Sequence, residues 1–143
     1  MIIPALINSI VFLILSGLHF YWALGGKIAF AEAIPKNSSG ERVFNPSKFQ
    51  SLLVGLGLLI FSWFYLVKIG FVPIDIPLKV LSITGWFIAA VFLLRAVGDF
   101  RYVGFFKKIK NTDFGRQDTR YYSPLCILLV GNAALVELIS PNI

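Results

Sequence analysis

The side chains most able to do chemistry in this chain lie within or beside apolar stretches. Arg95, Asp99 and Tyr102 occur in "LLRAVGDFRY" at steps of four and three residues, so on a helix they share one face. The spacing predicts that Arg95 contacts Asp99. Because a carboxylate in the last turn of a helix meets the negative end of the helix dipole, Arg95 and Arg101 are the expected partners of Asp99.

Two other segments bring polar side chains to a similar depth. His19 and Trp22 lie near the end of the first apolar stretch. The motif "DTRYYSP" precedes the last apolar stretch and contributes Asp118, Arg120 and Tyr121. In the same motif, Ser123 and Pro124 match the N-cap and the first position of a helix. We therefore expect a helix to begin there, with its positive end toward the polar residues.

These three segments predict one polar site at the cytoplasmic mouth of a helix bundle. Ionisable groups at membrane depth usually face the bundle interior and are a functional-site hypothesis. Arginines and a helix N-terminus suit an anionic headgroup or a small anion. The expected ligand-binding residues are His19, Trp22, Arg95, Asp99, Arg101, Tyr102, Asp118, Arg120 and Tyr121. In an alternative interpretation, the charged residues only tie helices together.

No catalytic or metal-binding signature is present in the sequence. With one His and one Cys, the chain cannot assemble the usual zinc ligand sets. It also has no phosphate-binding loop of the Walker type. We assign no catalytic residue, no metal ligand and no cofactor, and the pattern favours a protein that is not an enzyme.

The composition identifies lipid as the solvent of this chain. Hydrophobic residues make up 57% of the 143 residues and charged residues 14%, against roughly 25% charged in average proteins. The mean hydropathy is +0.81, and a water-soluble fold of this kind would expose large apolar patches. The net charge of +6 does not indicate nucleic-acid binding, because the basic residues flank apolar spans instead of lining a polar groove.

Four apolar stretches are long enough to span a membrane, which takes about 20 helical residues. They predict an all-α integral membrane protein: a single domain, residues 1–143, folded as an antiparallel bundle of four transmembrane helices. The helices are expected at about 2–24, 49–69, 78–100 and 123–139. Because a short connection joins the second and third helices, we expect these two to be antiparallel neighbours.

The distribution of basic residues predicts the orientation. Of the thirteen Lys and Arg, eleven lie in the connection before residue 49 or between residues 95 and 120. The positive-inside rule therefore places both long connections in the cytoplasm and both termini outside. In a competing interpretation the first helix is a cleaved signal peptide with "AFA" at 29–31, but it is longer than the usual apolar region of such peptides and lacks a preceding Lys or Arg.

Further polar and small residues carry structural predictions. Asn132 is expected to bond a neighbouring helix, and Glu137 to reach water near a helix end. The segment "GFFKKIK" is typical of an interfacial segment that attracts anionic lipids. Small residues that should allow close helix contact are Gly55, Gly57, Gly85, Ala89, Gly131 and Ala134.

Several long motifs resemble a known family. They are "GLHFYWALGG" (17–26), "GERVFNPS" (40–47), "LRAVGDFRYVGFFKK" (94–108) and "DTRYYSPLCILL" (118–129). These motifs resemble small bacterial membrane proteins catalogued as domain of unknown function 3995. The resemblance covers nearly the whole chain and implies four membrane helices, but it implies no activity.

Together the observations predict a binding or accessory protein of the bacterial cytoplasmic (inner) membrane. Its expected partners are membrane lipids, including anionic headgroups; nucleic acid is not expected, and assembly into a homo-oligomer is left open. One alternative is a small oligomeric transporter, in which polar groups should continue through the bilayer. The other is a lipid-modifying enzyme, in which His19 acts as acid or base within hydrogen-bond reach of the site.

Overall fold

The computed structural model describes residues 1–140 as an all-helical protein. Within this range four helical segments are long and apolar enough to cross a membrane, which confirms the predicted fold class. They are α1 (Ile2–Ala23), α2 (Lys48–Lys68), α3 (Leu78–Val97) and a composite helix of α4 (Asp113–Gln117), the π-helical segment η1 (Asp118–Tyr122) and α5 (Ser123–Ile139). No β-strand occurs in this part of the chain.

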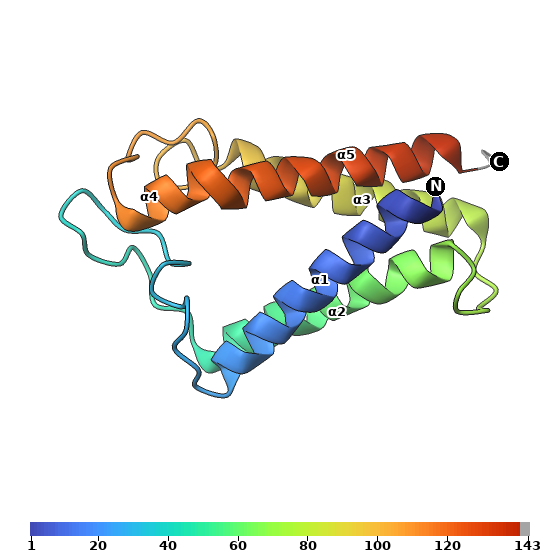
Figure 1. Cartoon of the computed structure of the whole chain (residues 1–143), viewed down its shortest axis with the longest axis horizontal. Coiled ribbons are helices and arrows are strands. Elements are labelled where there is room, and N and C mark those ends of the chain that lie inside the picture. The colour runs from blue at the N-terminus through green and yellow to red at the C-terminus, as the bar shows by residue number, and fades with distance from the viewer. Residues whose placement is uncertain (141–143) are drawn as a thin grey trace.

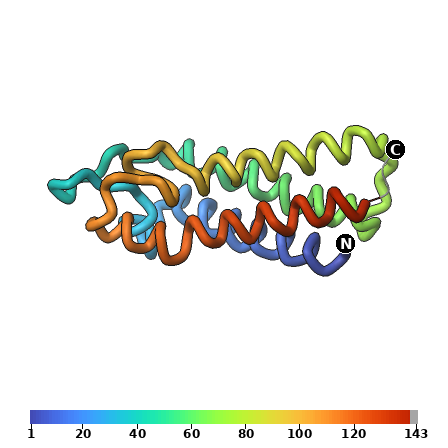
Figure 2. The backbone as a smooth tube through the Cα atoms, turned by 90° about the horizontal axis from the view of Figure 1, so that it is seen from above, coloured from blue at the N-terminus to red at the C-terminus, as the bar shows by residue number. Residues whose placement is uncertain are grey.

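The helices are arranged as two pairs that converge at one end. α1 packs against α2, and α3 packs against α5. Figure 1 shows the pairs meeting where both termini lie and separating toward the connections 24–47 and 98–112. The same two ends are seen from above in Figure 2. We call the end with the two long connections the long-loop end and the other the terminal end.

The prediction that the second and third helices are neighbours is wrong. α1 contacts both α2 and α5, whereas α2 and α3 make few contacts. One contact between α2 and α3 joins Phe61 to Phe92, whose ring centroids lie 6.4 Å apart. The nine residues between Lys68 and Leu78 include two prolines, which favour extended backbone. Nine extended residues can span about 30 Å, so a short connection does not force its two helices together.

Small and hydroxyl-bearing residues hold α1 against α2. Ser16 Oγ donates to the Gly55 carbonyl at 2.7 Å, and Ser9 Oγ donates to the Ser62 carbonyl at 2.9 Å. A Cβ on Gly55 would lie 2.8 Å from the Phe20 ring, so glycine permits this close approach. The prediction that small residues allow close helix contact is wrong for Gly57 and Gly131, because a Cβ at either would meet no atom within 4 Å.

Two predicted helix boundaries are also wrong. The third helix ends at Val97 instead of Phe100, because Gly98 adopts a φ of +84°. The last helix begins at Asp113, where Thr112 Oγ1 accepts the N–H of Gly115 at 2.9 Å.

The helix runs through Ser123 and Pro124, so Ser123 is not a side-chain N-cap. Proline lacks an N–H and crowds the preceding turn. The π-helical segment η1 ends at Tyr122, two residues before this proline, and its widened turn makes room for the proline ring.

Candidate functional site

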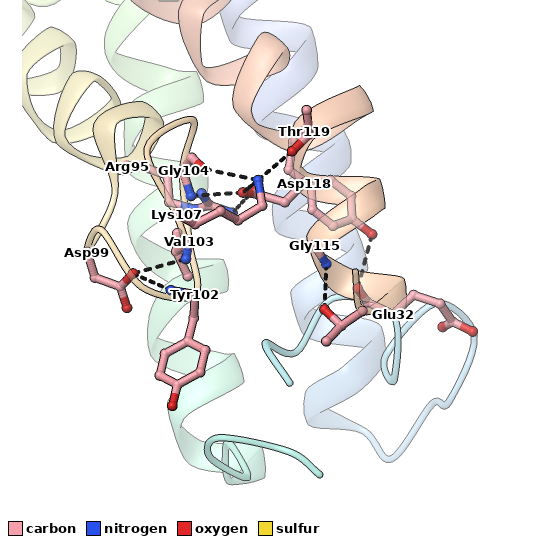
Figure 3. A network of polar contacts seen from close by, with 12 residues as sticks. Glu32, Arg95, Asp99, Tyr102, Val103, Gly104, Lys107, Gly115, Asp118 and Thr119 are labelled. Atoms are coloured by element: carbon pink, nitrogen blue, oxygen red, sulfur yellow. Dashed lines mark hydrogen bonds and ion pairs between the residues drawn. The ribbon is translucent and has the colours of Figure 1, made fainter. Parts of the chain in front are cut away.

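The most deeply buried carboxylate at the long-loop end belongs to Asp118. Its Oδ1 accepts a hydrogen bond from Arg95 Nη2 at 2.8 Å, and its Oδ2 accepts one from the Gly104 N–H at 2.8 Å. Lys107 Nζ lies 3.1 Å from Oδ2. We call these four residues the Asp118 cluster (Figure 3). The cluster links α3 and the connection 98–112 to the last membrane helix.

Lys107 is a member of this cluster that the sequence analysis missed. Its side chain is fully buried, and Nζ also donates to the Gly104 carbonyl at 3.0 Å and to Thr119 Oγ1 at 2.5 Å. The Lys107 ammonium therefore donates two hydrogen bonds and also forms an ion pair with Asp118. The interpretation of "GFFKKIK" as a lipid-attracting segment is wrong for Lys107, although Phe106 and Lys108 are exposed. A lysine beside aromatic residues suggests an interface, and no spacing distinguished it from a buried ion-pair partner.

The predicted Arg95–Asp99 contact is wrong. Arg95 pairs instead with Asp118, 23 residues further along the chain. Because α3 ends at Val97, Asp99 lies outside the helix and the four-residue spacing no longer places the two side chains on one face. Within residues 1–140, Arg95 Nη1 is buried without a hydrogen-bond partner.

Asp99 organises the loop that follows α3. Its Oδ1 accepts the backbone N–H groups of Arg101 at 2.9 Å, Tyr102 at 2.7 Å and Val103 at 3.0 Å. Figure 3 shows this carboxylate turned toward the loop backbone. The slight desolvation of this exposed carboxylate acts to raise the pKa of Asp99, but the three backbone hydrogen bonds outweigh it and hold the pKa below its usual value.

Two glycines make this loop compact enough to reach Asp118. Gly98 and Gly104 have φ angles of +84° and +87°, which favour glycine. A Cβ on Gly98 would lie 1.8 Å from the Val103 carbonyl oxygen, and one on Gly104 would lie 2.4 Å from the Val97 carbonyl oxygen. The spacing of "GDFRYVG" thus brings the Gly104 N–H to the Asp118 carboxylate.

The other predicted residues of this region form aromatic–cation pairs. The Arg101 guanidinium lies 5.1 Å from the Tyr102 ring centroid, and that of Arg120 lies 5.3 Å from the Tyr121 ring centroid. In the described chain neither arginine makes an ion pair. Arg101 and Arg120 therefore do not belong to the Asp118 cluster.

His19 and Trp22 lie at a separate place, between α1, α2 and the first connection, residues 24–47. Trp22 Nε1 donates to the Ile28 carbonyl at 2.9 Å, and its ring packs edge-on against His19 and Phe30. His19 Nδ1 bonds to the Leu15 carbonyl at 2.7 Å; because a carbonyl only accepts, this nitrogen carries the proton. Over residues 1–140 no hydrogen bond or ion pair links His19 or Trp22 to the Asp118 cluster.

The hollow beside His19 has two adjoining parts, which we call together the loop pocket. The inner part has a volume of about 470 Å³ and includes the apolar side chains of Phe30, Ile34, Phe44, Leu53 and Val54. The outer part has a volume of about 520 Å³ and includes Lys27, Arg42 and Lys48. Both parts share the residues Trp22, Phe30, Pro46 and Ser51.

The first connection, which forms one wall of the loop pocket, also contacts the last membrane helix. Tyr122 Oη donates to the Glu32 carbonyl at 3.5 Å (Figure 3), and Lys36 Nζ lies 3.6 Å from Asp113 Oδ2. His19 and Trp22 were predicted to be binding residues, whereas the basic residues of this connection were predicted only to set the topology.

The terminal end holds a second buried ion pair. Lys68 Nζ bonds to Glu137 Oε1, and both side chains are at least 95% buried. The prediction that Glu137 reaches water is therefore wrong. A Cβ on Gly85 would lie 1.7 Å from Glu137 Oε1, so this glycine leaves the space that the carboxylate occupies.

A hydrogen-bonded pair of amides joins α1 to α5. Asn132 Nδ2 donates to Asn8 Oδ1 at 3.0 Å, and Asn8 Nδ2 donates to the Leu129 carbonyl at 3.0 Å. This confirms that Asn132 bonds a neighbouring helix. Together with the Lys68–Glu137 pair, these bonds hold the two helix pairs together.

Comparison with known proteins identifies one family. The model of the family described as "Protein of unknown function (DUF3995)" matches residues 12–133. No curated protein and no solved structure matches the chain. The matched range contains the loop pocket and the Asp118 cluster.

Proposed function

The chain belongs to the DUF3995 family, and because that family carries no assigned function, we propose one from the site: a membrane-embedded binding protein that holds an anionic group in the loop pocket. One observation carries this proposal. Three cationic side chains line the outer part of the hollow, and among the described residues no acid lines either part. The volumes of the two parts, about 470 and 520 Å³, are typical of ligand sites, which span about 300–1,000 Å³.

The proposed membrane is the bacterial cytoplasmic membrane, with the long-loop end in the cytoplasm and both termini outside. The support is the charge distribution, since eleven of the thirteen Lys and Arg lie within or next to the two long connections. In this orientation the three cations of the pocket lie at the leaflet whose anionic lipids attract basic groups.

The Asp118 cluster serves this proposal as scaffold. Asp118 accepts hydrogen bonds from Arg95 and the Gly104 N–H and forms an ion pair with Lys107, which itself donates two further hydrogen bonds. An added anion would have to compete with a carboxylate already in place. We therefore keep His19 and Trp22 from the predicted site as ligand contacts, and assign Arg95, Asp99 and Asp118 to holding the long-loop end in shape.

The observations support binding over transport. Polar side chains between α1 and α2 are interrupted at Phe12, which is fully buried and packs its ring against those of Phe61, Tyr65 and Phe92. A polar path through the bilayer would have to cross this aromatic layer. Catalysis by His19 has less support, because within residues 1–140 no carboxylate bonds its ring.

Native mass spectrometry of the protein in neutral detergent tests the proposal. We expect the wild type to retain phosphatidylglycerol in preference to phosphatidylcholine when both are supplied. The triple variant Lys27→Gln, Arg42→Gln, Lys48→Gln should lose this preference. The matched control Lys79→Gln, Lys108→Gln, Lys110→Gln removes three exposed lysines elsewhere and should keep it. Equal retention by the two triple variants would refute the proposal.

A further inference from the structure

The two parts of the loop pocket differ in chemistry. Lys27, Arg42 and Lys48 line only the outer part, whereas Leu53 and Val54 line only the inner part. A water-soluble anion would contact the cations of the outer part, but it has no apolar group to contact the apolar side chains of the inner part. The arrangement instead matches a molecule with a charge at one end and an apolar portion at the other.

The inner part adjoins the surface that contacts lipid. Leu53 and Val54 are 51% and 48% exposed, and the same helix exposes other large apolar side chains. This exposed apolar surface of α2 faces hydrocarbon in a membrane-spanning helix. A lipid chain can therefore enter the inner part from the bilayer while its headgroup remains at the level of the cations.

The first connection supplies the other wall and is anchored. Ile34 is 2% exposed, and Trp22 Nε1 holds the Ile28 carbonyl at 2.9 Å. Phe44, by contrast, is 53% exposed while lining the inner part. An apolar chain lying between Phe44 and α2 would cover the exposed part of that ring.

We propose that the ligand of the loop pocket is an anionic lipid of the surrounding bilayer. Its phosphate or carboxylate lies among Lys27, Arg42 and Lys48, and one acyl chain lies against Phe44, Leu53 and Val54. The inference rests on the proposed function and adds the ligand class. A free anion and a lipid headgroup share the same charge chemistry, so the test must separate them by the apolar chain.

Trp22 provides the signal for this test because it lines both parts of the pocket. The chain has three tryptophans, and the other two, Trp63 and Trp86, are about half exposed. Replacing both by Phe leaves Trp22 as the sole tryptophan. This variant, in phosphatidylcholine nanodiscs, is titrated with dodecyl phosphate, with inorganic phosphate and with the neutral amphiphile dodecyl maltoside.

We expect dodecyl phosphate to change Trp22 emission saturably, and inorganic phosphate not to compete. Val54→Phe, which fills the inner part, should raise the half-saturating concentration about tenfold, a typical effect of one misplaced apolar group in a pocket. Phe44→Ala, on the connection, removes wall area without altering a membrane helix and should also weaken binding. The control Ile60→Phe places the same ring on the exposed surface of α2 outside the pocket and should leave the titration unchanged.

Each other result has a distinct meaning. Competition by inorganic phosphate, with no effect of Val54→Phe or Phe44→Ala, would overturn the lipid and leave anion binding standing. An equal response to dodecyl maltoside, unchanged by the Lys27, Arg42 and Lys48 triple variant, would overturn both proposals in favour of an uncharged apolar hollow. No response to either phosphate probe would also overturn both.

Discussion

Two carboxylates are buried at opposite ends of this protein, and they are stabilised in different ways. Asp118 at the long-loop end forms ion pairs with two cations and accepts a hydrogen bond from the Gly104 N–H. Glu137 at the terminal end bonds one cation through Oε1, while its Oε2 is buried without a partner in the described residues. The first carboxylate joins a loop to two helices, and the second joins one helix to another.

The difference shows which buried charges the fold depends on. A buried ion pair can often be replaced by apolar residues of similar volume, whereas removal of one partner is costly. Asp118 also satisfies a backbone N–H, which an apolar side chain cannot do. We therefore expect the terminal pair to be replaceable as a unit and the Asp118 cluster not to be.

The largest expected effect follows from Asp118→Asn. The change leaves Arg95 and Lys107 without a compensating charge, and we expect a loss of about 3–5 kcal/mol in unfolding free energy, measured by denaturation in detergent. The control is Asp113→Asn, whose exposed pair with Arg116 contributes about 0–1 kcal/mol. Similar losses in the two variants would remove the distinction between this cluster and surface ion pairs.

At the terminal end, Glu137→Gln should lower the unfolding free energy by about 3 kcal/mol, the lower end of the range for a broken buried pair. The loss is at the lower end because Lys68 is the last residue of α2 and its side chain can extend toward the membrane surface. The double variant Lys68→Met, Glu137→Leu should recover most of this loss in the same denaturation assay. If it proved less stable than Glu137→Gln, the terminal pair would be as irreplaceable as the Asp118 cluster.

Gly85→Ala tests the space that α3 provides for the Glu137 carboxylate. A Cβ there would overlap Oε1, and overpacking of this kind typically costs about 1–3 kcal/mol. Thermal unfolding of the detergent-solubilised protein measures the change. Gly57→Ala on α2, which meets no atom within 4 Å, is the matched control and should not be destabilised. Equal melting temperatures for the two variants would contradict the packing at Gly85.

The smallest expected effect concerns Asp99, which acts on the cluster only through its loop. Its pKa is lower in the folded protein, so its stabilisation is present above the unfolded pKa and is lost as the pH falls through the folded pKa, below about pH 4. Asp99→Asn keeps the acceptor oxygen and removes the titration. We expect it to lower stability at pH 6 by well under 1 kcal/mol, since the carboxylate is exposed. The difference from wild type should shrink as the pH falls below about 4 and vanish below the folded pKa. A difference independent of pH would exclude the ionised carboxylate as its cause.

The candidate site was predictable only in part. His19 and Trp22 were identified because polar and amphipathic residues near the end of an apolar helix are conspicuous. The partner of Arg95 was not, since it depends on Gly98 ending α3 before Asp99 and on η1 preceding Pro124. Lys107 was missed for a related reason. It is buried because its loop folds back between helices, and such burial produces no periodic pattern of apolar residues in the sequence.

The four membrane helices follow from the sequence alone, because a spanning segment must be long and apolar and must satisfy its backbone hydrogen bonds internally. These are local requirements that each stretch meets alone. Three features required the folded arrangement of the chain: α1 pairs with α2 and α3 with α5, Asp118 and Glu137 are buried, and Lys27, Arg42 and Lys48 line one pocket. Such relations depend on where helices end and how loops return, and charge pairing between distant residues follows from that geometry.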